Sequence, residues 1–192
     1  ASSGVSARGT YAGVVEKIPY LKDLGITAVE LMPVTEFDEI MMSASGSGFH
    51  DAKPEPTGYL NYWGYGPSYL YAVKSAYASH GEMSAECEFK TLVKELHKAG
   101  IECIPEIYFT GKELPGEILS VLRYWAEEYH VDGFHLSGFP DLSLAAEDPF
   151  LRRTKLFAEN WNEVMNRRPK QGYITPGDGV VSVEEKNLAE YN

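Results

Sequence analysis

The sequence predicts an α/β fold with a parallel sheet, and three observations indicate it. Apolar residues recur at helical spacing in several segments, a short strand-like apolar run follows each of these segments, and glycine separates helix from strand at Gly25 and Gly100. Four such alternations are typical of right-handed βαβ units. The units build either a doubly wound sheet or part of a (β/α)8 barrel.

The first two helix–strand pairs carry the clearest signals. A helix with Val14, Ile18, Leu21 and Leu24 on one face is expected to end at Gly25, before a strand over residues 26–33. Ser84 is a suitable N-cap for a second helix, which Gly100 ends before a strand over 101–109. The apolar face of this second helix holds Phe89, Leu92, Val93 and Leu96.

The later elements are expected from weaker patterns. Pro115 can open a third helix, followed by a short strand over 133–136. A weak helical stretch at 142–153 precedes a strand over 155–159, and the tail after Trp161 has no pattern. Between Glu36 and Thr57 the periodicity is lost, which predicts a long loop that is either functional or a disordered surface insertion.

Composition and charge exclude several classes of binding partner. The 192 residues suit one domain, and a formal net charge of −11 would repel nucleic acid and anionic membrane surfaces, so a neutral partner is expected. No apolar run reaches the roughly 18 residues of a membrane helix, and no phosphate-binding glycine loop is present. Cys87 and Cys103 lie far apart and outside any CxxC or Cys/His cluster, which predicts two buried apolar cysteines, a cytoplasmic location, and neither a zinc site nor a disulfide framework. No metal and no cofactor are expected.

Ligands of parallel α/β folds bind at the carboxyl ends of the strands. The residues that follow the predicted strands are therefore the candidate site residues. They are Glu36 and Asp38, Thr110 and Gly111, Ser137, and Glu159 to Asn162.

Five segments, in this order, resemble the α-amylase superfamily, glycoside hydrolase family thirteen. They are residues 9–11 (GTY), 16–33 (EKIPYLKDLGITAVELMP), 61–65 (NYWGY), 88–102 (EFKTLVKELHKAGIE) and 129–134 (YHVDGF). Within the family the likeness is to isoamylase, pullulanase and glycogen-debranching enzymes. The resemblance implies a (β/α)8 barrel that acts on α-glucans with a nucleophilic Asp after strand four and a general-acid Glu after strand five.

The sequence departs from this pattern at the catalytic positions. Glu159 keeps the general-acid position, whereas Ser137 occupies the nucleophile position and His135 the position of the family's Arg. Retaining hydrolysis needs two carboxyl groups, and a serine without a base is a poor nucleophile. Because positions i and i+2 of a strand share a face, His135 either acts as a base for Ser137 or only fills the space left by Arg. After strand three the chain carries Glu106 and then Thr110-Gly111, where the family has an Asp followed by Asn-His.

The resemblance also implies that residues 1–192 are a single segment of the catalytic domain, spanning about strands two to five of a longer chain. Three functions stay open: a catalytically inactive, glucan-binding or regulatory pseudoenzyme, an active debranching hydrolase, and a structural module without glucan affinity. The expected partners are an α-glucan or maltooligosaccharide and the remainder of the barrel. The expected substrate-binding side chains, chosen because aromatic rings stack on sugars, are Tyr62, Trp63, Tyr65 and Trp161.

Overall fold

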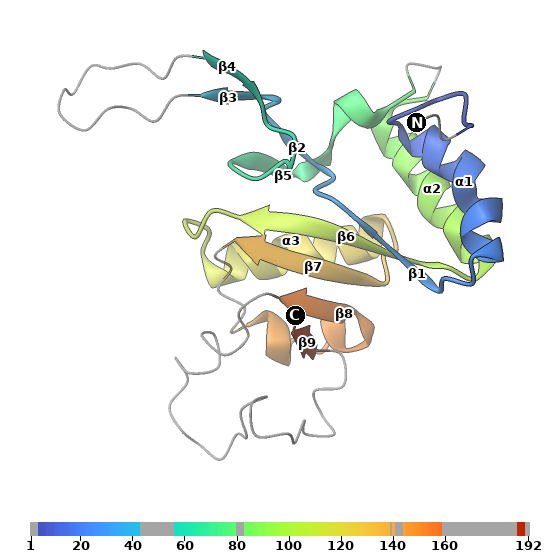
Figure 1. Cartoon of the computed structure of the whole chain (residues 1–192). Helices are drawn as coiled ribbons and strands as arrows, with labels where there is room; N and C mark the ends of the chain where they lie inside the picture. Colours follow the sequence, from blue (N-terminus) through green and yellow to red (C-terminus); the bar gives the residue numbers. More distant parts are fainter. Residues whose placement is uncertain are drawn as a thin grey trace.

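The computed structural model describes residues 4–42, 56–79, 83–138, 140, 144–158 and 188–190. Its centre is a five-stranded sheet with the order β1-β6-β7-β8-β9, in which every neighbouring pair is parallel. Figure 1 shows β6 and β7 side by side at the middle of the molecule. The strands are β1 (Ala28–Leu31), β6 (Glu102–Phe109), β7 (Gly133–Gly138), β8 (Lys155–Ala158) and β9 (Leu188–Glu190). The predicted parallel α/β sheet is confirmed, although the tail was expected to have no strand.

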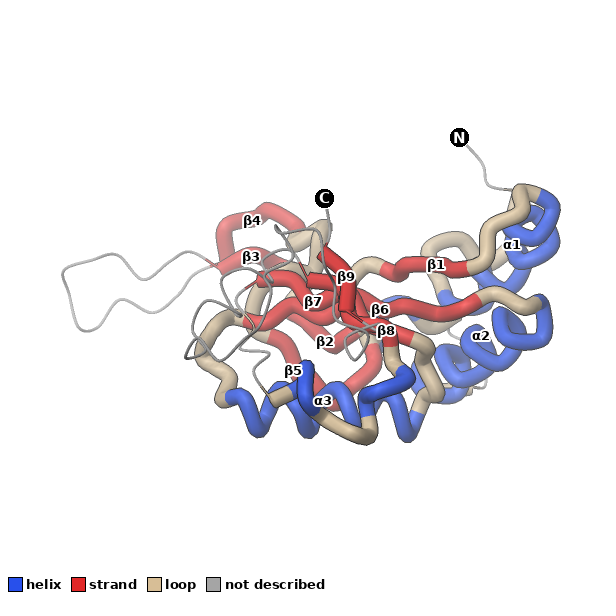
Figure 2. Tube along the Cα trace, turned by 90° about the horizontal axis from the view of Figure 1, so that it is seen from below, coloured by secondary structure: helices blue, strands red, loops and turns tan. Residues whose placement is uncertain are grey.

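The three predicted helices are confirmed as α1 (Tyr11–Asp23), α2 (Ala85–Ala99) and α3 (Pro115–Glu128). Ser84 Oγ accepts a hydrogen bond from the Cys87 amide at 3.3 Å, so it caps α2 as expected. Gly100 ends α2 with φ of 77°, a conformation that residues with a side chain rarely adopt. Helices α1 and α2 lie against each other, and α3 runs along the strands (Figures 1 and 2).

The helix predicted over 142–153 is wrong for the described part of that stretch. Residues Ala145–Glu147 (η2) and Leu151–Arg153 (η3) form two short 3₁₀ turns. Between them Asp148 is extended, with ψ of 122°, and Pro149 follows it. A residue that precedes proline is disfavoured in the helical region, which agrees with the break between the two turns at this point.

The long loop predicted after Glu36 is also wrong for the residues that can be described. Strand β2 (Thr35–Phe37) pairs antiparallel with β5 (Ser68–Val73), followed by η1 (Ser75–Tyr77), and β3 (Ile40–Met42) pairs antiparallel with β4 (Pro56–Leu60). These strands are short, and the β2–β5 pair has an irregular register between Thr35 and Glu36. For these reasons the sequence shows no period-two pattern here. Figure 1 shows β3 and β4 extending away from the main sheet.

The hydrophobic core lies between the sheet and the helices. Phe89, Leu92, Leu96, Leu122 and Trp125 are completely buried there. Among the strand residues, Ile104 and Phe134 are buried, while Val29 and Leu31 are only partly covered. Val29 and Leu31 belong to β1, which has a neighbour on one side only within the described sheet. Cys103 is buried as expected, but Cys87 is exposed because it lies in the first turn of α2.

Candidate functional site

The face of the sheet opposite to the core, here called the inner face, carries the polar side chains. On β6, Cys103 and Ile107 belong to the core, so Glu106 between them points to the other side. Glu106 is paired in register with His135 of β7, and Glu30 of β1 is paired with Ile104. The inner face therefore brings together Glu30, Glu106, His135 and Ser137.

His135 and Ser137 share this face, as the alternation predicts, but they do not form a nucleophile–base pair. Both are almost completely buried, and Ser137 Oγ has no hydrogen-bond partner among the described residues. His135 instead contacts Glu30, with Nδ1 2.8 Å from Oε1. The hydrogen bond that would let His135 activate the Ser137 hydroxyl is therefore absent from this arrangement.

Glu106 lies beside His135 and is 3% exposed. One ligand atom from each of Glu30, Glu106 and His135 lies within 4.8 Å of those of the other two. No short-range sequence motif identifies this group, since its members come from three strands and its outer members, Glu30 and His135, are 105 positions apart. Only the strand register, taken together with the alternation, could have predicted it.

An aromatic row lies at the carboxyl end of β6. It consists of Tyr62, Trp63, Tyr65 and Tyr108. Trp63 stacks on Tyr65 with centroids 6.4 Å apart, and Tyr65 stacks on Tyr108 at 5.1 Å. Tyr62 meets Trp63 edge to face at 5.4 Å. The structure therefore unites three predicted substrate-binding residues and adds Tyr108, which the sequence analysis did not select.

The turn that holds this row is fixed by Asn61 and Gly64. Asn61 Oδ1 accepts a hydrogen bond from the Gly64 amide at 3.1 Å, and its Nδ2 donates to the carbonyls of Asp38 and Tyr65. Gly64 has φ of 76°, and a Cβ there would lie 2.7 Å from the Phe37 ring. Only glycine fits this position. Tyr62 and Trp63 stay 76% and 58% exposed on this rigid support.

The loop after β6 is short, as predicted. Glu113 closes it by accepting hydrogen bonds from Thr110 Oγ1 at 2.8 Å and from the Gly111 amide at 3.0 Å. Burial acts to raise the pKa of Glu113, but these hydrogen bonds outweigh it and the pKa is lowered. Helix α3 starts two residues later, so this part of the chain offers no long wall for a cleft.

Glu36 stabilises the β2–β5 pair through hydrogen bonds to residues that follow β5. Its carboxylate accepts hydrogen bonds from buried Lys74 Nζ at 2.8 Å and from the Ser75 amide at 2.6 Å. Burial raises the pKa of Glu36, whereas Lys74 and Ser75 lower it, and the net shift is downward. Asp38 and Glu39 lie beside them around an open pocket. The predicted site residues Glu159 and Trp161 lie outside the described residues.

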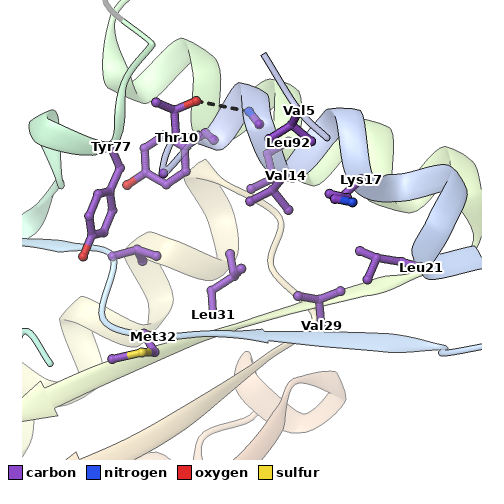
Figure 3. Close-up of a pocket in the computed structure, with 14 residues that line it drawn as sticks. Val5, Thr10, Val14, Lys17, Leu21, Val29, Leu31, Met32, Tyr77 and Leu92 are labelled. Atoms are coloured by element: carbon purple, nitrogen blue, oxygen red, sulfur yellow. Dashed lines mark hydrogen bonds between the residues drawn. The ribbon is translucent and has the colours of Figure 1, made fainter. Parts of the chain in front are cut away.

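A second pocket, of about 460 Å³, lies between α1, α2 and β1. Figure 3 shows Val29 and Leu31 facing Val14 and Leu21 across it. Its lining is mostly aliphatic, which does not suit a sugar, whose hydroxyl groups need hydrogen-bond partners.

Comparison with known families gives the decisive observation. Residues 1–109 match the family model described as the alpha amylase catalytic domain. The chain belongs to the α-amylase family. The match covers more than half of the chain, and the predicted likeness to the isoamylase and pullulanase branch of glycoside hydrolase family thirteen, an α-glucan-degrading family, is confirmed.

Relatives of this α-amylase family chain include isoamylase 3 of rice, a chloroplastic protein, with 32% identity over 84% of the chain and 28% of the relative. A glycogen operon protein GlgX homologue of Haemophilus influenzae is 31% identical over 81% of the chain and 31% of its own length. The chain thus spans about three-tenths of these relatives.

Among solved structures, a Paenibacillus barengoltzii pullulanase in complex with maltohexaose and α-cyclodextrin shares the fold. The TM-score is 0.66 with 18% identity, covering 99% of the chain and 37% of the pullulanase. The catalytic module of the pneumococcal glycogen-degrading protein SpuA aligns with a TM-score of 0.61 and 19% identity over 83% of the chain and 29% of the module. None of the helices that the structure describes is long and apolar enough to cross a bilayer.

Proposed function

We propose that this chain is a segment of a (β/α)8 barrel domain that binds α-glucan without hydrolysing it. In this proposal β1, β6, β7 and β8 are strands two to five of the barrel, and β9 is a further parallel strand beside them. The aromatic row carries the proposal. It presents exposed, nearly parallel rings of Trp63 and Tyr65 beside the carboxyl end of the sheet, where barrel enzymes bind their ligands. Flat apolar faces of pyranose rings stack on such side chains.

The titles of the solved relatives support an α-glucan as the ligand. One pullulanase structure contains maltohexaose, and SpuA is described as glycogen-degrading. A neutral sugar polymer also fits a chain whose net charge is −11, because no ionic attraction is required. Tyr62, Trp63 and Tyr65 are the proposed contacts, with Trp161 as a further candidate.

The proposed lack of hydrolysis rests on the residues at the carboxyl ends of the strands. The family's retaining chemistry needs two carboxyl groups about 5 Å apart, one to attack and one to donate a proton. Ser137 stands where the nucleophilic carboxylate is expected, and neither His135 nor another described residue accepts its proton. Glu159 alone could protonate a leaving group, but no covalent intermediate would form.

The partial barrel is supported by the edge of the sheet. β1 lies at one end of the strand order, and the aliphatic pocket next to it has room for further apolar side chains. The occupant that we propose for this surface is the remainder of the same barrel. The curated relatives, of which the chain covers 28% to 31%, are long enough to provide it.

Calorimetric titration of the full-length protein with maltohexaose tests the proposal. We expect saturable binding that weakens at least tenfold in Trp63→Ala and in Tyr65→Ala. Tyr69→Ala is the matched control, because Tyr69 is 75% exposed but lies outside the aromatic row. Equal affinity in all three variants, or release of reducing ends that Glu159→Gln abolishes, would contradict the proposal.

A further inference from the structure

We infer that Glu30, Glu106 and His135 form a binding site for one divalent transition-metal ion of the Zn²⁺ or Mn²⁺ class. Their ligand atoms lie within 4.8 Å of one another on three adjacent strands of the inner face. The sequence analysis expected no metal, because Cys87 and Cys103 form no ligand cluster, and it did not consider this group. The site does not depend on glucan binding, so the two proposals can fail independently.

Charge is the first argument. Two carboxylates lie next to a single imidazole, and Glu106 is only 3% exposed. A buried ionised carboxylate is unfavourable without a cation or several hydrogen bonds. Within the described ranges no lysine or arginine forms an ion pair with Glu30 or Glu106, since Lys155, on the same face, pairs with Glu102 instead.

An unused acceptor is the second and independent argument. Glu106 Oε1 is buried and has no hydrogen-bond partner among the described residues. Buried polar atoms without partners are rare in folded proteins, and an ion that is missing from the coordinates is a common explanation. The Glu36 carboxylate is a useful contrast, because Lys74 and Ser75 satisfy it directly.

The spacing of the donors is the third argument. His135 Nδ1 and Glu30 Oε1 are 2.8 Å apart. Two ligands in neighbouring positions of an octahedral ion, each at roughly 2.1 Å, would lie about 3 Å apart. An ion could therefore replace the proton between these atoms with only a small shift of the side chains.

The donor set favours one class of ion. One imidazole nitrogen with two carboxylate oxygens suits Zn²⁺ or Mn²⁺, whereas Ca²⁺ and Mg²⁺ prefer oxygen ligands alone. The Glu30 side chain is 40% exposed, so the site has a path for the ion and space for water ligands on that side.

Titration with ZnSO₄ after dialysis of the full-length protein against EDTA tests the inference. We expect one equivalent of Zn²⁺ whose Kd rises at least tenfold in Glu106→Gln and in His135→Gln. Glu102→Gln is the matched control, since Glu102 lies on the same strand and face but is already paired with Lys155. No such equivalent, or the same Kd in Glu106→Gln, would overturn the site, as would uptake of Ca²⁺ alone.

A second measurement uses the unmodified protein, so its result does not depend on whether a substituted variant folds. With MnCl₂ as the probe, pulsed electron paramagnetic resonance of the unmodified protein should show coupling to one imidazole nitrogen. Bound Mn²⁺ without nitrogen coupling would place the ion elsewhere and overturn the inference.

Discussion

The two faces of the parallel sheet differ sharply in chemistry. On the helix-covered outer face, Ile107, Phe134 and Leu156 are completely buried among apolar side chains. On the inner face, Glu106 and Ser137 are just as inaccessible, yet each has a polar atom without a hydrogen-bond partner in the described structure. One face is built for packing, and the other retains buried polar groups that packing alone does not explain.

This difference indicates that residues on the inner face can change while the packing that forms the fold is kept. Burial of apolar surface is the dominant favourable term in folding, and here it lies between the outer face and the helices. Ser137, which the resemblance aligns with the family's carboxylate, lies on the other side and is not part of that core. Substitutions on the two faces should therefore have opposite consequences for stability.

The largest effect is expected for Trp125→Ala on the outer side. Trp125 is completely buried in α3, packs against Phe89 and Tyr129, and donates a hydrogen bond from Nε1 to the Leu70 carbonyl at 2.7 Å. We expect a loss of about 3–5 kcal/mol in the free energy of unfolding, measured by urea denaturation. Tyr69→Ala, at an exposed position, should change it by less than about 0.5 kcal/mol. Similar losses in both variants would contradict the assignment of the core.

A smaller effect is expected for Asp148→Asn, at the turn between η2 and η3. The Arg123 guanidinium, by hydrogen bonding, holds the pKa of Asp148 below its usual range, and the amides of Phe150 and Leu151 add to this. Because the folded pKa lies below the unfolded one, the stabilisation is present above the unfolded pKa and is lost as pH falls through the folded pKa.

The Asp148→Asn variant should lose about 1–2 kcal/mol at neutral pH, since Asn keeps an acceptor for the two amides but loses the charge. Its stability should also depend less on pH in the acid range, as measured by urea denaturation between pH 3 and 7. Glu127→Gln, at an exposed position of α3, is the control. An unchanged acid dependence in Asp148→Asn would show that the Arg123 contact does not stabilise the turn.

The elements that the sequence could predict differ from the others in how local their determinants are. Strands β6 and β7 and helix α2 were predictable because their patterns are local: an N-cap at Ser84, one apolar face, and Gly100 at the end. The helix expected at 142–153 failed because Pro149 interrupts a stretch that otherwise looks periodic. The short strands β2 to β5 depend on partners distant in the chain, so no local pattern reveals them.

The candidate site was predictable only in part. The likeness to the family located Ser137 and His135, and the Tyr62–Tyr65 segment, by position in a motif. The contact between His135 and Glu30 spans 105 positions and follows from the register of three strands. Similarly, Tyr108 joins the aromatic row because β6 ends beneath Tyr65, which no spacing in the sequence indicates.

On the inner face, Ser137→Ala should leave stability unchanged or raise it by up to about 1 kcal/mol. The variant removes a buried hydroxyl without a partner, and removal of such a group does not break a hydrogen bond. Ser79→Ala is the matched comparison, because the Ser79 hydroxyl donates to buried Glu88 and its loss should destabilise the fold by about 1 kcal/mol. If the Ser137 variant were the less stable of the two, the hydroxyl would have to contact a group that the described residues do not include.

The smallest effect is expected from an attempt to restore catalysis with the double substitution His135→Arg, Ser137→Asp in the full-length protein. By the proposed alignment, this change returns the family's side chains to β7, and Glu159 keeps the general-acid position. We nevertheless expect no release of reducing ends from maltooligosaccharides. Glu113 ties Thr110 and Gly111 into a tight turn at the positions that the resemblance aligns with the family's Asn-His. By this alignment the sugar would lack the contacts that position it for attack.

A matched measurement keeps the double substitution interpretable. Maltohexaose binding should persist in the variant, because Trp63 and Tyr65 are untouched, and this would show that the domain still folds. Turnover above the level of the unsubstituted protein would mean that the two substituted side chains of β7 are all that catalysis lacks. It would also mean that the short turn after β6 does not limit the reaction. Binding without turnover would instead locate the defect in the strand ends around β6 as well as in β7.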